Sequence, residues 1–401
     1  MTVLFYILAA LLVFFSYKSF RGGLAYLKYF KSEISKPGSN FTPNASVIVP
    51  CRGLDADLKT NLSTLFRQDY PKYEVIFVID DECDPALKVI EEVSRKDAKN
   101  AKVVIAGKAS RSSQKVENLR EAVLHASGDS KVFVFMDSDA RPNEDWLRNL
   151  VAPLEDETIG ASTGYRWFIS EKPTFASELL SVWNASIASA LGPNTKSNFC
   201  WGGSMAIRRD IFERLDIREK WSGTLSDDFI VTRAMNEVGL PIHFVPQALT
   251  ASFGNYTFHE LLEFTARQMK ITRVYAPKLW RMSFFGAALF NLVLLWAFYI
   301  VIFSRANDVH FWAAIAVIVI VSFFSVGKSW LRLRAAKLAL NRYEIQLDRQ
   351  FWTQNTLCIL APAVFLYNSI AALCSRKLAW RGIRYEMISP KETRVIDGRE
   401  K

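Results

Sequence analysis

The sequence VFVFMDSDARPNEDW, residues 132–146, places an apolar, β-branched run directly before Asp137, Ser138 and Asp139. The run has the length and composition of a buried strand. Three similar runs precede it, and residues with helical spacing follow each of them: 45–50, 73–79 and 102–105. This alternation predicts an α/β domain with a mostly parallel sheet flanked by helices, in which ligands bind at the carboxyl ends of the strands. Asp137 and Asp139 are therefore expected at a ligand-binding edge.

Long apolar segments surround this domain. Half of the 401 residues are hydrophobic and the mean hydropathy is +0.08. One N-terminal and two to three C-terminal transmembrane helices are predicted, because four segments approach the ~20 residues that cross a bilayer: 2–17, 284–303, 311–326 and 357–373. Pro362 interrupts the last segment. Basic residues after the first segment, such as Lys18 and Arg21, favour a cytoplasmic location for the domain that follows, by the positive-inside rule.

These patterns divide the chain into six parts. The first apolar segment lacks a cleavage site, so we interpret it as a retained anchor. The six expected parts are an anchor at 1–20, a juxtamembrane linker at 21–44, the cytoplasmic α/β domain at 45–258, an interfacial amphipathic segment at 259–282, the C-terminal transmembrane region at 283–375 and a basic tail at 376–401. The WRGIRY sequence in the tail is typical of an anchor at the membrane surface.

The net charge of +10 fits a lipid bilayer as partner, and no nucleic-acid-binding motif accompanies it. The five cysteines form no CxxC pair, which indicates reduced thiols. With four histidines in the chain, a catalytic metal would need oxygen ligands.

Asp137 and Asp139 are suited to Mg²⁺ or Mn²⁺ that also binds a diphosphate. An Asp-rich turn that caps the next helix is the alternative interpretation. The sequence contains neither GxGxxG after the first strand nor GxxxxGK[ST], so it lacks a glycine-rich phosphate-binding loop. A metal would then have to neutralise the diphosphate, as in nucleotide-sugar transferases.

Several motifs together resemble inverting glycosyltransferase family 2, which has the GT-A fold. They are VIVPCRG (47–53), VIFVIDD (75–81), FMDSD (135–139), CWGGSMAIRRDIF (200–212) and SDDFIVTRAMNEVGL (226–240). Three more are similar to the ceramide glucosyltransferase branch: DECDPA (81–86), QKVENL (114–119) and LAWRGIRYEM (378–387). The resemblance covers about residues 45 to 387.

The resemblance implies donor-binding roles for residues on two strands and one helix. Asp80 and Asp81 would contact uridine, and Asp84 competes with them because the alignment can slip. Lys115 would lie near the nucleotide or its phosphates, although it could equally be an exposed helix lysine.

The resemblance also assigns metal and catalytic residues. Asp137 and Asp139 would hold the metal, with Asp137 also on the donor diphosphate. Asp228 matches the catalytic base that accepts the proton of the acceptor hydroxyl, and Asp227 precedes it. Both aspartates begin a predicted helix, so either could instead act in the first turn as a cap.

The expected acceptor side includes Trp201, Gly202 and Gly203, where glycine permits close approach of a ligand to the backbone. A tight turn between strands is the alternative. Family members often carry Gln-x-x-Arg-Trp and the ceramide branch carries Arg-x-x-Arg-Trp; Arg267 and Lys270 match the cations of the branch motif and would neutralise the diphosphate. The chain departs from the motif at Ile271, where the family has Trp.

The acceptor follows from the membrane segments. A polysaccharide synthase needs several helices around a polar pore, whereas the three C-terminal apolar segments contain few polar residues. We therefore expect a membrane-bound enzyme that adds a single sugar to a lipid, and the resemblance implies transfer of a sugar, with glucose favoured, from a UDP-sugar to a ceramide-like lipid. Diacylglycerol, sterol or hopanoid acceptors and a polysaccharide synthase remain alternatives.

Overall fold

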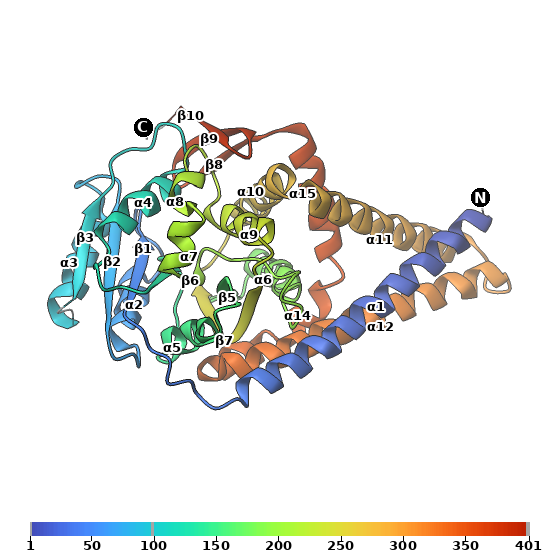
Figure 1. Cartoon of the computed structure of the whole chain (residues 1–401). Coiled ribbons are helices and arrows are strands. Elements are labelled where there is room, and N and C mark those ends of the chain that lie inside the picture. The colour runs from blue at the N-terminus through green and yellow to red at the C-terminus, as the bar shows by residue number, and fades with distance from the viewer. Residues whose placement is uncertain (1, 98–99, 398–401) are drawn as a thin grey trace.

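The computed structural model describes residues 2–97 and 100–397, and consists of an α/β domain from which long helices extend (Figure 1). Seven strands form the sheet in the order β3-β2-β1-β4-β6-β5-β7. All neighbouring pairs are parallel except those that β6 makes with β4 and β5, which confirms the mostly parallel sheet. The strands are β1 (Ala45–Pro50), β2 (Tyr73–Ile79), β3 (Ala101–Ile105), β4 (Val132–Met136), β5 (Ala161–Ile169), β6 (Ser204–Arg208) and β7 (Ile242–Phe253).

The strand sequences explain why both faces of this sheet are buried. In β4, Val132 and Val134 belong to one hydrophobic cluster, while Phe133 and Phe135 belong to another. Successive side chains of a strand point to opposite faces, so a continuous apolar run supplies both cores. The helices of this domain are α2 (Leu58–Ser63), α3 (Ala86–Asp97), α4 (Gln114–Ala122), α5 (Trp146–Val151), α6 (Phe175–Ala188), α7 (Arg209–Arg214), α8 (Ile217–Lys220), α9 (Asp227–Glu237) and α10 (Phe258–Tyr275).

Three described helices are long and apolar enough to cross a membrane: α1 (Thr2–Ile34), α11 (Pro277–Phe303) and α12 (Val309–Ala339). This agrees with one N-terminal and two C-terminal spans. The last apolar segment forms α14 (Phe351–Leu357) and α15 (Ala361–Cys374), bent by 59°. The bend lies just before Pro362, and the pair is either a broken span or a re-entrant loop. Between α12 and α14 lies the short α13 (Glu344–Arg349).

The N-terminal helix is longer than expected. The linker predicted from residue 21 is helical as far as Ile34, because nothing in this sequence breaks the helix before Pro37. α1 packs along α12 (Figure 1). Gly327 lies at their contact, where an added Cβ would be 2.8 Å from the Phe20 ring.

The C-terminal sequence folds onto the α/β domain, and its expected contact with a membrane surface remains a prediction. It forms a three-stranded antiparallel sheet of β8 (Lys377–Trp380), β9 (Ile383–Ser389) and β10 (Glu392–Asp397). Apolar residues alternate along β9, and Ile383, Tyr385 and Met387 pack into the catalytic domain core. Figure 1 shows this sheet in red beside α8 and α10, far from the tip of α1 and α12.

The predicted interfacial segment is also divided differently. A capping box of Thr257 and Glu260 begins α10, which ends at Tyr275, and residues from Pro277 onward belong to α11. One side of α10 is covered by α6 and α15. Whether its other side lies in a membrane interface remains a prediction.

Candidate functional site

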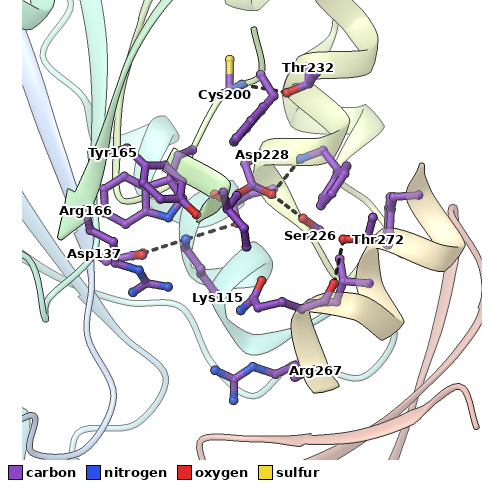
Figure 2. A pocket seen from close by; sticks show the side chains of 18 of the residues that line it. Lys115, Asp137, Tyr165, Arg166, Cys200, Ser226, Asp228, Thr232, Arg267 and Thr272 are labelled. Carbon is purple, nitrogen blue, oxygen red and sulfur yellow. Dashed lines mark hydrogen bonds and ion pairs between the residues drawn. The ribbon is translucent and has the colours of Figure 1, made fainter. Parts of the chain in front are cut away.

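The carboxyl ends of the central strands border a cavity of about 950 Å³. Asp137 and Asp139 follow β4 into this cavity, as the sequence predicted for the ligand-binding edge of the sheet. Side chains from α4, α9 and α10 face the same space (Figure 2). The site therefore combines residues that are far apart along the chain, from Pro50 to Tyr385.

Lys115 links the acidic residues of the cavity. It lies in the first turn of α4, which Ser113 caps by accepting a hydrogen bond from the Val116 N–H. Its Nζ is 2.7 Å from Asp137 and 3.3 Å from Asp227 (Figure 2). Burial disfavours the ammonium charge, but the neighbouring carboxylates outweigh burial and raise the pKa of Lys115. The lysine is a buried cation at the site, and not an exposed helix residue.

The two aspartates of the Asp-Ser-Asp sequence have different environments. Burial is the largest single effect on Asp137 and acts to raise its pKa, but Lys115, Arg166 and Arg381 together outweigh it and the pKa is lowered. Burial dominates at Asp139 and raises its pKa, although Arg166 Nη1 lies 3.3 Å from its Oδ2. The Oδ1 atom of Asp139 is buried without a hydrogen-bond partner. Such an oxygen can accept a metal ion or another cation.

The predicted base and its neighbour are also distinguished by their surroundings. Asp228 Oδ1 accepts hydrogen bonds from Ser226 Oγ at 2.5 Å and from the Phe229 N–H at 2.8 Å, and the Gly202 N–H lies 3.4 Å from Oδ2 (Figure 2). Asp227 is 2% exposed, and burial raises its pKa to about 6 despite the nearby Lys115. Both carboxylates line the cavity, and Asp228 is the more accessible. Ser226 holds the N-cap position of α9 without a capping bond from its side chain, and Asp228 satisfies the first-turn N–H of Phe229 instead.

The glycine pair on the predicted acceptor side packs tightly behind the carboxylates. A Cβ at Gly202 would lie 2.1 Å from Asp227 Oδ2, and one at Gly203 would lie 2.7 Å from Asp137 Oδ2. The absence of a side chain therefore lets the backbone approach the acidic cluster. Trp201 lines the cavity, with its ring 5.2 Å from the Arg166 guanidinium. An acceptor role for these residues remains a prediction.

The residues expected to contact uridine are not among those that line the cavity. Asp80 is 4% exposed and pairs with Arg52, which does line the cavity. Asp81 lies 3.2 Å from Lys108, and Asp84 accepts hydrogen bonds from the Gly53 and Ala86 N–H groups. Asp84 thus fixes the loop after β1, and direct contact of these aspartates with a nucleotide stays a prediction.

The two predicted cations on α10 diverge. Arg267 lines the cavity, and burial together with Arg166 lowers its pKa to about 10. Lys270 donates to the carbonyl of Lys377 at 2.8 Å and does not line the cavity. The Arg267 guanidinium instead lies 5.5 Å from the ring of Trp380, which comes from β8.

The cavity also contains polar and aromatic residues that were not predicted as site residues from the sequence, among them Asp55, Tyr165, Arg166, Trp380 and Arg381. They come from the loop after β1, from β5 and from the β8–β9 hairpin. No spacing rule relates them to the aspartates, because the sheet order and the return of the C-terminus bring them together. One sequence signal could have identified Arg166: it lies inside the apolar run of β5, and a buried charge requires a partner.

The cavity also has an apolar side that leads toward the membrane helices. Trp183 and Phe264 line it, as do Phe365 of α15 and Leu279 and Ser283 in the first two turns of α11. One cavity therefore joins the buried carboxylates to the start of a candidate membrane span.

The sequence matches a family model described as glycosyl transferase family 21 over residues 7–393. A ceramide glucosyltransferase 3 from Caenorhabditis elegans is 30% identical over 126 residues, which are 31% of this chain and 27% of that protein. A ceramide glucosyltransferase from Candida albicans is 27% identical over 122 residues, 27% of this chain and 22% of that protein. The chain thus aligns with about a quarter of each relative's length. These matches confirm the ceramide glucosyltransferase resemblance.

One of the similar solved structures is a mannosyltransferase from Pyrobaculum calidifontis in complex with GDP-mannose and Mn²⁺. The sequences are 18% identical, the TM-score is 0.43, and the alignment covers 90% of this chain and 99% of that one.

Proposed function

This chain belongs to glycosyl transferase family 21, and on that premise we propose that it transfers a sugar from a UDP-sugar to the hydroxyl of a membrane lipid. The curated relatives are named ceramide glucosyltransferases, so glucose and a ceramide-like lipid are the proposed substrates. One observation carries the proposal: a single cavity extends from the strand-end carboxylates to the first two turns of α11. A polar donor and a lipid acceptor can meet in such a cavity.

Asp137 and Asp139 fit a divalent metal, Mg²⁺ or Mn²⁺. The unpaired, buried Oδ1 of Asp139 requires a partner, and carboxylate oxygens are the ligands that these cations prefer. Among the described residues, no group of three or more His, Cys, Asp or Glu is placed to hold a metal. Donor phosphate oxygens would therefore complete the ligand set. A bound metal supplies charge that neutralises the departing diphosphate.

Asp228 is the proposed general base. The acceptor hydroxyl oxygen forms a bond to the anomeric carbon of the sugar while the bond from that carbon to the diphosphate oxygen breaks. The hydroxyl proton passes to the Asp228 carboxylate, and UDP leaves with the electron pair. A single displacement of this kind inverts the anomeric configuration. The hydrogen bonds from Ser226 and Phe229 orient the carboxylate before the acceptor arrives.

Cations around the diphosphate would stabilise the leaving group in the same step. Lys115 and Arg267 both line the cavity and come from two different helices, α4 and α10.

The proposal is tested by UDP release from the purified chain in lipid nanodiscs with Mn²⁺ or Mg²⁺. UDP-glucose, UDP-galactose and UDP-N-acetylglucosamine are each paired with ceramide, diacylglycerol, sterol or hopanoid. We expect a glycolipid and UDP from UDP-glucose with ceramide, and a loss of at least ~100-fold in Asp228→Asn. Asp210→Asn is the matched control, because Asp210 has a 72% exposed side chain outside the cavity.

Three outcomes would contradict parts of the proposal. Full turnover by Asp228→Asn removes Asp228 as the base. Glycosylation of another lipid replaces the acceptor, and extension of a soluble saccharide without any glycolipid indicates a polysaccharide synthase.

A further inference from the structure

The turn between β8 and β9 presents an arginine to the donor side of the cavity. Trp380 pairs with Ile383 across a two-residue turn formed by Arg381 and Gly382. Their φ angles are +52° and +76°, and both are in the left-handed region that tight hairpin turns require. Gly382 adopts this conformation easily, whereas a long side chain such as arginine does so at a cost of roughly 1 kcal/mol or more. Because an arginine in this conformation costs stability, we expect its side chain to have a function.

The backbone of this turn is fastened to the loop after β1. Arg381 Nη1 donates to the Arg52 carbonyl at 3.0 Å, and Arg52 Nε donates to the Arg381 carbonyl at 3.0 Å. Arg52 also pairs with Asp80 at the end of β2. These contacts hold the turn at the carboxyl edge of the sheet. They occupy only one terminal nitrogen of the Arg381 guanidinium, Nη1.

The second terminal nitrogen of the Arg381 guanidinium, Nη2, contacts the acidic residues of the cavity. It lies 2.6 Å from Asp55 Oδ1, and Ser138 Oγ donates to the other Asp55 oxygen at 2.5 Å. Ser138 is the middle residue of the Asp-Ser-Asp sequence. Although burial opposes the charge, Asp55, Asp139 and Asp137 raise the pKa of Arg381. The arginine side chain lines the cavity and is 35% exposed.

We propose that Arg381 binds the diphosphate of the sugar donor, and that Asp55 holds its guanidinium in position when no donor is bound. This inference rests on the proposed function, which supplies the nucleotide-sugar. A guanidinium offers two parallel N–H donors to phosphate, whereas Asp55 accepts from it through one oxygen only, because Ser138 donates to the other.

The contact made by Lys270 supports this assignment. Lys270, which the family motif assigns to the diphosphate, donates to the backbone of Lys377 in the same small sheet. Arg381 brings a positive charge from that sheet into the cavity instead. The hairpin therefore contributes a donor-binding residue, together with the Trp380 ring beside Arg267.

A purely structural role makes a different prediction. If Arg381 acts only by fastening the hairpin to Asp55, loss of either partner should have the same effect on binding. If Arg381 exchanges Asp55 for phosphate, loss of the carboxylate removes a competitor and loss of the arginine removes a ligand.

The experiment measures binding of UDP and of uridine to the full chain in nanodiscs with Mn²⁺ by calorimetry. We expect Arg381→Gln to weaken UDP binding by about 10- to 100-fold, because charged hydrogen bonds are lost, and to leave uridine binding unchanged. Asp55→Asn should bind UDP at least as tightly as the wild type. Arg394→Gln is the matched control, because Arg394 lies exposed on β10 outside the cavity.

The melting temperature of each variant is measured to show that it is folded. Arg381→Lys is a second variant that keeps the charge, and its UDP affinity should lie between those of the wild type and Arg381→Gln. Unchanged UDP affinity in Arg381→Gln overturns the inference, as does equal weakening in Arg381→Gln and Asp55→Asn. Both results leave the proposed function intact. A wild-type chain that binds neither UDP nor another nucleoside diphosphate overturns both proposals.

Discussion

Lys115 and Asp137 form a 2.7 Å ion pair in the interior, with the lysine from α4 and the aspartate from the end of β4. The same ammonium lies 3.3 Å from Asp227. Removing a buried cation leaves both carboxylates without their charge partner. We expect Lys115→Met to lower the free energy of unfolding by about 3 kcal/mol in detergent, measured by chemical denaturation. Lys88→Met on the exposed face of α3 should have no such effect, and equal stability of the two variants would contradict the pairing.

Asp227 gives the site a pH-dependent stability. Burial raises its folded-state pKa to about 6, above the ordinary value of 3.8, so folding favours the protonated form. Its favourable contribution is present below about pH 4 and is lost as pH rises through 6. Asp227→Asn should therefore melt at a higher temperature than the wild type at pH 8, with a smaller difference at pH 5. A difference that is constant between these pH values would argue against a raised pKa.

Asp139 should control the metal dependence of donor binding. Its buried, unpaired Oδ1 is the oxygen best placed for a cation. We expect Mn²⁺ to strengthen UDP binding to the wild type by about tenfold or more, and EDTA to reverse this. In Asp139→Ala the affinity for UDP should be nearly the same with Mn²⁺ and with EDTA. If EDTA leaves the wild-type affinity unchanged, the Asp-Ser-Asp sequence is a turn and does not bind a metal.

Gly202 should tolerate no side chain. A Cβ there would meet Asp227 Oδ2 at 2.1 Å and Lys115 Nζ at 2.8 Å, in a part of the site that cannot easily move. We expect Gly202→Ala to cost about 1–3 kcal/mol of stability and to reduce UDP binding. Gly192→Ala is the comparison, because nothing lies within 4 Å of the corresponding Cβ. Equal behaviour of both variants would show that the space opposite Gly202 is open.

The sheet could be predicted from sequence because its apolar runs are short, β-branched and separated by helical patterns. The predicted strands at 45–50 and 73–79 match β1 and β2, and Asp137 appears where β4 ends. The parallel arrangement followed from the alternation alone. These features are local, so each could be read within a window of about ten residues.

The C-terminal hairpin could not be predicted in this way. The basic and aromatic residues of WRGIRY fit a membrane surface equally well, and their true partners, such as Asp55 and Gln114, lie more than 250 positions away. Arg166 was missed for a similar reason, since its partner Asp139 comes from a different strand. Long-range pairing of charges depends on the sheet order, which no local pattern encodes.

The length of α1 sets a geometric condition on the whole enzyme. Its 33 residues extend about 50 Å, whereas a bilayer core is about 30 Å thick, so roughly the last 20 Å can stand clear of the lipid tails. At that end, Tyr29 donates to the Phe244 carbonyl and Gln247 donates to the Glu33 carbonyl, which join the helix to β7. These hydrogen bonds hold the sheet, and with it the cavity, at a set distance from the other end of α1. Under the proposed function, this distance decides how far from the bilayer core an acceptor hydroxyl must reach.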